Sequence, residues 1–222
     1  MPSDTTVATL DIISDVVCPW CYIGKRRVAQ ALDLIPEVPL QVRWLPYELN
    51  PTMPAAGMER KSYYSRKFGS DQSADELIAN ITVNAHNDGL AMDYEKISRV
   101  PNTRTAHRLI WYAARFDAQD AIVDALFEAY FVAGRNIGAP DELAKIAAEA
   151  GLDHADAERF LAGDEALDIV TTEAKSAHSS GIQGVPAFLV NGQYLFSGAQ
   201  SPETISLSIK RAITRQTRMS VQ

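Results

Sequence analysis

Cysteine is scarce in this chain of 222 residues, which contains only Cys18 and Cys21. A structural zinc site usually needs four ligands, so the others would have to be histidines. No second paired motif is present to supply them. The four histidines stand singly at His86, His107, His154 and His178. A disulfide that closes so short a loop also removes little chain entropy. The short loop therefore argues against a purely structural disulfide. Because further paired ligands are lacking, we expect no metal site.

The chain also lacks a long apolar run and an excess of positive charge. Its formal net charge is −7, and no basic stripe with interleaved aromatic residues is present, which argues against a nucleic-acid partner. No stretch approaches about eighteen uninterrupted apolar residues, and Asp11 and Asp15 interrupt the first apolar run. We therefore expect neither a signal peptide nor a membrane span. A cytoplasmic location follows as a prediction, in a compartment that keeps thiols reduced.

The two cysteines form the motif Cys18-Pro19-Trp20-Cys21, directly after an apolar strand that the sequence predicts over residues 7–13. Pro19 suits the first position of a helix, where its missing N–H costs nothing. The N-terminus of a helix carries partial positive charge and favours a thiolate, which is the nucleophile of disulfide exchange. Cys18 is therefore predicted at an exposed helix cap, with Cys21 about one turn further and partly covered. This is the geometry of a dithiol redox centre.

Strand and helix patterns predict two halves of an α/β protein around a helical insertion. The first half is a strand–helix–strand unit with a parallel strand pair, and the second is a helix, a hairpin and a last helix. Asn191-Gly192 supplies the positive φ angles that the tight hairpin turn needs. The expected elements cover residues 7–13, 19–34, 40–45, 164–178, 187–190 and 193–196, and the last helix opens at 201. Because no strand pattern lies between the halves, we expect one domain over 1–45 and 164–222, and an all-helical insertion domain over 46–163.

Three smaller expectations concern single side chains. Ser73 and Glu76 form a capping box that predicts the start of a helix within the insertion. The cations at 25–27, about two turns from Cys18 along the first helix, are expected to form a solvated face. His107 is expected either to border the active site or to pack in the core.

Four stretches in this order resemble the DsbA family, and more narrowly its FrnE-type cytosolic branch. They cover residues 14–25, 102–109, 181–188 and 197–200. The resemblance implies a thioredoxin-like fold (βαβ plus ββα) with a large all-helical insertion. It also implies a thiol–disulfide oxidoreductase in which Cys18 attacks and Cys21 resolves. Pro186 would be cis and face the dithiol, leaving the backbone of Val185 free to pair with a bound peptide or glutathione. Pro19, Trp20 and Val185 would bind substrate, with Trp20 as a partly exposed wall of the groove.

The same superfamily contains 2-hydroxychromene-2-carboxylate isomerases and kappa-class glutathione transferases, which typically carry serine where Cys18 stands. The presence of both cysteines favours dithiol chemistry. Two alternatives stay open: a glutathione-dependent isomerase or transferase on the same fold, and a redox-switched, chaperone-like binding protein. We expect no bound cofactor, and a thiol or disulfide substrate that is a protein or glutathione. The sequence leaves the physiological substrate, the direction of electron flow and the oligomeric state open.

Overall fold

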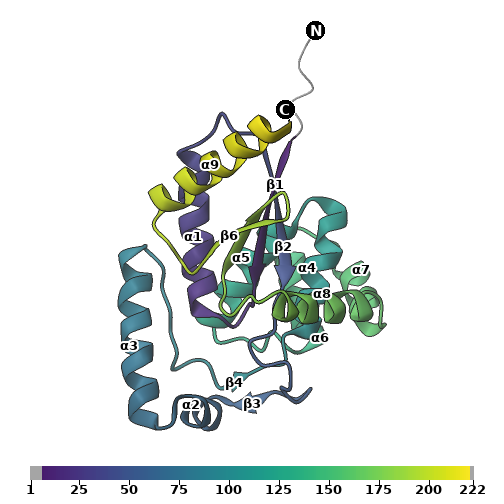
Figure 1. The fold of residues 1–222 in the computed structure, drawn as a ribbon. Helices are drawn as coiled ribbons and strands as arrows, with labels where there is room; N and C mark the ends of the chain where they lie inside the picture. Colours follow the sequence, from purple (N-terminus) through teal and green to yellow (C-terminus); the bar gives the residue numbers. More distant parts are fainter. Residues whose placement is uncertain (1–6, 221–222) are drawn as a thin grey trace.

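A four-stranded mixed sheet forms the centre of the protein, whose computed structural model describes residues 7–220 (Figure 1). The strand order is β2-β1-β5-β6. Strand β1 (Ala8–Ser14) pairs in parallel with β2 (Leu40–Pro46) and antiparallel with β5 (Ala187–Val190), which pairs antiparallel with β6 (Gln193–Ser197). The most N-terminal strand is therefore central, and its almost continuously buried pattern fits an apolar strand with neighbours on both sides.

A charged pair fixes the register between β1 and β2. Asp11 lies opposite Arg43 in the parallel ladder. The Arg43 guanidinium donates two hydrogen bonds to the Asp11 carboxylate, at 2.6 and 2.9 Å. This bidentate pairing satisfies a carboxylate that the sheet buries.

Helices cover both sides of the sheet (Figure 1). Helix α9 (Pro202–Ser220) packs along α1 (Pro19–Asp33) and against the β5–β6 hairpin. On the other side, three helices contact β2: α4 (Arg104–Ala113), α5 (Gln119–Phe131) and α8 (Leu167–Ser179). None of the helices within residues 7–220 is both long enough and apolar enough to cross a membrane.

The segment between β2 and α8 is mostly helical, as expected, but it also contains a small sheet. Its two strands, β3 (Met58–Glu59) and β4 (Arg99–Val100), pair antiparallel, so the prediction of no strand in this segment is wrong. Two residues per strand are too few to show an alternating pattern. The other elements are α2 (Arg60–Phe68), α3 (Asp71–Asn87), a 3₁₀ turn at Ala114–Phe116, α6 (Pro140–Glu149) and α7 (His154–Ala162).

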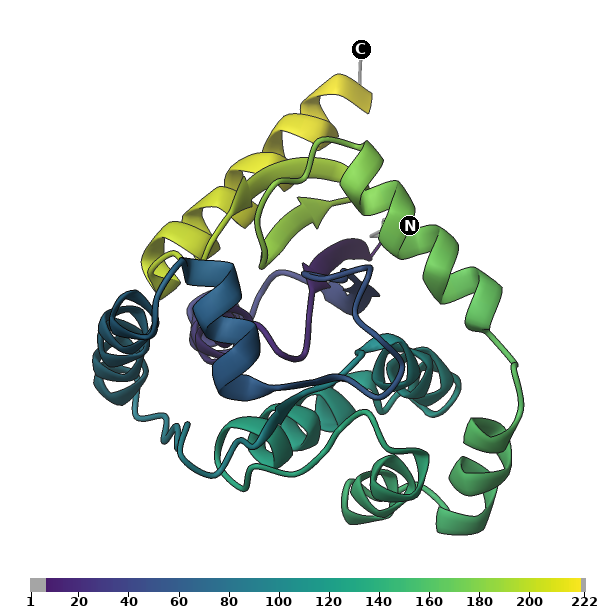
Figure 2. The ribbon, with the colours of Figure 1, turned by 90° about the horizontal axis from the view of Figure 1, so that it is seen from below.

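Helix α2 is absent from the sequence-based prediction, and α3 begins earlier than predicted. The Glu59 carboxylate caps α2 by accepting hydrogen bonds from the backbone N–H groups of Lys61 and Ser62, at 2.8 and 2.7 Å. Ser70, rather than Ser73, caps α3, because its hydroxyl accepts the Ser73 N–H at 3.1 Å. The end-on view in Figure 2 shows α2 lying across the middle of this face of the molecule.

The cations of α1 do not form a uniformly solvated face. Lys25 is buried, and its Nζ lies 3.0 Å from the Asp120 carboxylate and 2.6 Å from that of Asp124, both on α5. Arg27 is half-buried and pairs with Asp88 at 2.8 Å. Only Arg26 of the three is exposed, as predicted. The acids that draw Lys25 inward are distant in sequence, because α5 packs against α1 only in the folded chain.

Candidate functional site

Cys18 is the N-cap residue of α1, in extended backbone conformation, and Pro19 occupies the first helical turn. The Cys18 carbonyl oxygen accepts the backbone N–H of Cys21 at 3.0 Å, so the two cysteines flank one helical turn. Both are free thiols. The turn contains no acidic residue, so the positive end of the helix dipole acts on the Cys18 sulfur without an opposing carboxylate in that turn.

The prediction that Cys18 is exposed is wrong, because the residue is only 5% exposed. Tyr63 and Tyr64 of α2, together with Val185 of the loop before β5, line the same cavity as Cys18. These residues lie around the helix cap in the folded chain. Cys21 is completely buried, as a resolving thiol one turn further should be.

Burial governs the chemistry of Cys21. Loss of hydration, followed by the hydrogen bond and charge of Cys18, raises the pKa of the Cys21 thiol well above its usual value. The Ser14 hydroxyl and the backbone of Asp15 offset part of this rise. Cys21 is therefore protonated at neutral pH in the reduced protein.

The Val185–Pro186 peptide bond is cis, as the resemblance implies. The Cys18 thiol donates to the Val185 carbonyl oxygen at a sulfur–oxygen distance of 3.7 Å. The Pro186 carbonyl accepts the Gly198 N–H at 2.7 Å, which ties this loop to the end of β6. Pro186 also packs on α1, where a Cβ atom at Gly24 would lie only 2.7 Å from Pro186 Cγ. Glycine at position 24 is what allows this approach.

We expect Gly24→Ala to destabilise the protein. Overpacking costs about 1–3 kcal/mol, which outweighs the roughly 1 kcal/mol that alanine gains over glycine inside a helix. Urea unfolding of the reduced protein, with a comparison of midpoints and slopes, measures the change. Gly184→Ala, in the loop that precedes Pro186, is the control, because a Cβ atom there meets nothing within 4 Å. Equal stabilities of the two variants would contradict the packing argument.

An apolar cavity of about 300 Å³ opens beside the Cys18 sulfur. Pro19, Trp20 and Val185, the residues predicted to bind substrate, all line it with Cys18, and Trp20 is partly exposed as expected. Cys21 and Pro186 are not part of its lining. The opposite wall comes from the insertion, with Leu49, Tyr63, Tyr64, Lys67, Phe68, Leu77, Ile78, Ile81, Tyr94 and Val100.

Sequence reasoning missed this opposite wall. The only local signal is the cluster of aromatic residues Tyr63, Tyr64 and Phe68 within a strongly cationic segment. The aromatic rings lie on one side of α2, where Tyr64 contacts Phe68 at 5.6 Å and Tyr94 at 6.5 Å between ring centroids. Aromatic residues at helical spacing among charges indicate a helix with one packed face, but they do not indicate the element against which that face packs.

His107 packs in the core rather than against the cavity. Its Nε2 lies 2.9 Å from the Tyr47 carbonyl oxygen and 3.5 Å from an Asp15 carboxylate oxygen. Asp15 is itself buried, and its other carboxylate oxygen accepts the Leu49 N–H at 2.7 Å. The two side chains thus fasten the loop after β1 to the segment after β2.

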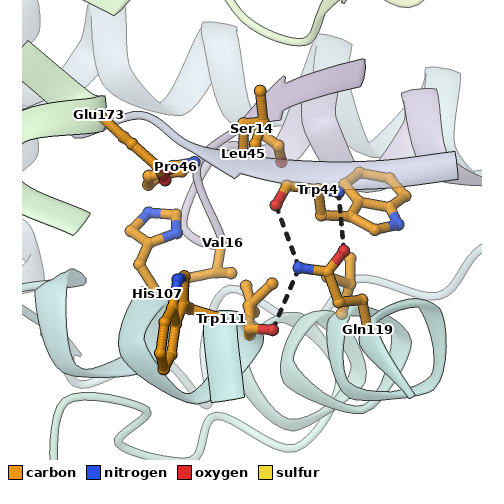
Figure 3. A pocket seen from close by; sticks show the side chains of 11 residues that line it. Ser14, Val16, Trp44, Leu45, Pro46, His107, Trp111, Gln119 and Glu173 are labelled. Carbon is orange, nitrogen blue, oxygen red and sulfur yellow. Dashed lines mark hydrogen bonds between the residues drawn. The ribbon is translucent and has the colours of Figure 1, made fainter. Parts of the chain in front are cut away.

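A second, smaller pocket lies beside His107 (Figure 3). Its volume is about 60 Å³, and neither cysteine lines it. Gln119 bridges it, since its side-chain amide donates to the carbonyl oxygens of Trp44 and Ile110 and accepts the Trp44 N–H at 3.2 Å (Figure 3). With these hydrogen bonds satisfied, Gln119 links β2 to α5, and the pocket has a structural character. Within residues 7–220, no group of three or more His, Cys, Asp or Glu side chains is placed to hold a metal ion.

Comparisons with known proteins agree with this geometry. The model of a family described as the DSBA-like thioredoxin domain matches residues 9–210. The chain belongs to this family. The structure is similar to that of a probable DsbA oxidoreductase from Streptomyces coelicolor, with a TM-score of 0.84 and 29% identity over 93% of this chain and 90% of that chain.

Two further relatives of this DSBA-like chain are more distant. The fold is shared with the cytosolic disulfide reductase DsbM from Pseudomonas aeruginosa, solved with GSH, at a TM-score of 0.62 and 18% identity over 96% of this chain and 99% of that chain. In sequence, the uncharacterized protein YwbO of Bacillus subtilis (strain 168) is 26% identical over 201 residues, which is 90% of this chain and 94% of that protein. The thioredoxin-like fold and the DsbA-family resemblance are thereby confirmed, whereas the FrnE-type branch stays a prediction.

Proposed function

We propose that this protein is a thiol–disulfide oxidoreductase that exchanges disulfides through Cys18-Pro19-Trp20-Cys21. One observation carries the proposal: two free thiols flank the first turn of α1, and the outer one lies beside an apolar cavity and 3.7 Å from the Val185 carbonyl. Membership of the DSBA-like family supports it.

The proposed reaction has two steps. The Cys18 thiolate attacks one sulfur of a substrate disulfide, which forms a mixed disulfide and releases one substrate thiolate. The Cys21 thiolate then attacks the Cys18 sulfur, which forms the Cys18–Cys21 disulfide and releases the second substrate thiolate. Two electrons pass from the protein to the substrate, and the reverse sequence donates the disulfide.

The first step falls to Cys18 because of its position. Cys18 lines the cavity, whereas Cys21 is completely buried and does not. Cys18 is the N-cap residue of α1, so its sulfur lies at the positive end of the helix dipole. Pro19, Trp20 and Val185 are proposed to contact the substrate, and Pro186 to hold Val185 in place against Gly24. A protein thiol or glutathione is the proposed redox partner, and the cytoplasm the proposed location.

A redox titration tests the proposal. The protein is equilibrated in glutathione buffers, and thiol trapping with mass measurement counts its free thiols. We expect a reversible two-electron transition to an internal disulfide, with a midpoint between about −270 and −120 mV, the values of thioredoxin and DsbA. A stable glutathione adduct on Cys18 without an internal disulfide would favour the glutathione-dependent isomerase or transferase. The absence of any transition would favour the chaperone-like binding protein or the glutathione-dependent enzyme. Either result would overturn the proposal.

A further inference from the structure

The cavity beside Cys18 has the features of a selective binding site. Its walls are apolar and aromatic, and among the described residues that line it only Lys67 carries a formal charge. Its volume of about 300 Å³ falls at the lower end of the range for small-molecule sites. Cys18, the proposed nucleophile, forms part of the same wall as Trp20.

Lys67 has unused capacity to bind an anion. Its ammonium group donates to the Tyr63 hydroxyl at 3.0 Å and lies 5.3 Å from the Tyr63 ring and 5.9 Å from the Phe68 ring. No carboxylate within residues 7–220 forms an ion pair with it, and the residue is exposed. An ammonium group has three donors, so two are left for a ligand.

Arg60 on the same helix has no such capacity. Its guanidinium is buried, donates to the Ile97 carbonyl at 2.8 Å and lies 3.7 Å from the Glu95 carboxylate. It does not line the cavity. Lys67 is thus the cation of α2 that faces the site.

The cavity lining contains another polar side chain, Tyr94. Tyr94 lines the cavity and is only 5% exposed, yet its hydroxyl makes no hydrogen bond within the described chain. A buried hydroxyl without a partner is costly, and each such group in a native protein calls for an explanation. Burial chiefly, and then the charges of Tyr64 and Cys18, raise the pKa of Tyr94. The hydroxyl therefore stays protonated and keeps a donor without a partner on a residue of the cavity lining.

We infer that this cavity binds the apolar part of a low-molecular-weight thiol or disulfide that carries one anionic group, which pairs with Lys67, while the Tyr94 hydroxyl donates to the ligand. This inference rests on the proposed function and names its substrate class. A single cation and a single hydroxyl without a partner in an otherwise apolar and aromatic lining fit one defined small molecule better than the varied side chains of polypeptides.

The exchange within this site balances in atoms and electrons. The Cys18 thiolate attacks the sulfur of the cavity-bound group R in R–S–S–R′, forming Cys18–S–S–R and releasing R′–S⁻. The Cys21 thiolate then attacks Cys18, forming the internal disulfide and releasing R–S⁻. The protein dithiol gives up two electrons and two protons, which the two released thiols retain.

Two aryl disulfides of different charge test the role of Lys67. The reduced protein is mixed in single turnover with 5,5′-dithiobis(2-nitrobenzoate), which carries one carboxylate on each ring, and separately with neutral 4,4′-dithiodipyridine. We expect Lys67→Gln to lower the ratio of the first rate to the second by about tenfold, the value of one charge-assisted hydrogen bond. Lys61→Gln is the matched control, because it removes the same charge from α2 at a residue outside the cavity. It should leave the ratio within twofold of the unmodified protein.

A second pair of variants tests the hydroxyl. Tyr94→Phe removes one oxygen and leaves the ring in place, so we expect an increase of at least about threefold in the half-saturating concentration of 5,5′-dithiobis(2-nitrobenzoate), for the loss of one hydrogen bond. Tyr130→Phe is the matched control, since the Tyr130 hydroxyl is also buried without a partner but lies outside the cavity. We expect no change in half-saturation there.

Three results would overturn the inference. The first is an unchanged rate ratio in Lys67→Gln together with unchanged half-saturation in Tyr94→Phe. The second is an equal fall in Lys61→Gln and Lys67→Gln, which would reflect overall charge alone. The third is slower reduction of insulin disulfides by Lys67→Gln and Tyr94→Phe, while both variants react with the two aryl disulfides at unchanged rates. That result would assign the cavity to polypeptides. In each case exchange with 4,4′-dithiodipyridine persists and the proposed function stands. Failure of every disulfide to oxidise the unmodified dithiol would overturn the proposed function itself.

Discussion

Replacement of Cys18 by serine is expected to abolish disulfide exchange, whereas replacement of Cys21 by serine should stop the reaction at a mixed disulfide. A serine hydroxyl is not ionised at neutral pH and cannot form a sulfur–sulfur bond, so Cys18→Ser removes the first step. Cys21→Ser leaves the first step intact, because Cys18 keeps its place at the cavity and beside Val185. Non-reducing mass analysis after mixing with oxidised glutathione distinguishes the two outcomes.

The two serine variants control for each other. Both substitutions remove one sulfur atom from the same helical turn, so a general loss of folding would affect both and would be visible by circular dichroism. Reductase activity that survives Cys18→Ser would show that the nucleophile has been assigned wrongly. Full turnover in Cys21→Ala would instead indicate a glutathione-dependent isomerase or transferase, in which the second thiol has no task.

Local sequence signals predicted the parts of the fold that depend on neighbouring residues. Asn191-Gly192 predicted the hairpin turn, and both residues have positive φ, at 49° and 75°. Pro19 predicted the start of α1, and the apolar run before it became the central strand. Such features depend on backbone preferences within a few residues, which a sequence displays directly.

The burial of Cys18 depends on contacts that are distant in the chain. Its neighbours around the cavity include residues of α2, more than forty positions later, and Val185, 167 positions later. Helix α2 carries mostly charged and polar side chains, and its cap is a glutamate rather than one of the commoner cap residues. Its Tyr64 ring packs near Tyr94 beside the candidate site, a contact between distant residues that local patterns do not reveal. The sequence therefore predicted the wall of the candidate site that carries the Cys18-Pro19-Trp20-Cys21 motif. It did not predict the facing wall, which comes from the helical insertion.

Lys25 illustrates the same limit for electrostatics. Three consecutive cations on a helix are typical of a solvated face. Lys25 is buried because Asp120 and Asp124 of α5 meet its ammonium group, at positions 95 and 99 residues further along the chain. A buried charge is tolerated only when it is paired in this way. The pairing is a property of the packed helices, and the sequence of α1 alone contains no sign of it.

The resolving step is expected to become about tenfold faster for each pH unit across the neutral range, because thiolate is the attacking species. Burial raises the pKa of Cys21 well above its usual value, so the thiolate is a small fraction at neutral pH and grows as the pH rises. Between pH 6 and pH 8 the rate at which the mixed disulfide converts to the internal disulfide should rise by about 100-fold. Acid quench at timed intervals, followed by mass analysis, measures this conversion. A plateau within that range would mean that Cys21 is already ionised there.

The same raised pKa links pH to folding, and the sign can be derived. A thiol whose pKa is higher in the folded than in the unfolded state binds its proton more tightly when folded, so it contributes stability that is present below the unfolded pKa of about 8.5. That contribution falls as the pH rises past this value towards the folded pKa. We therefore expect the reduced protein to lose stability to urea above about pH 8.5, and Cys21→Ser to lose less. Identical pH profiles for the two proteins would mean that the Cys21 proton is not held by burial, and the rate of the resolving step should then level off above about pH 8.5.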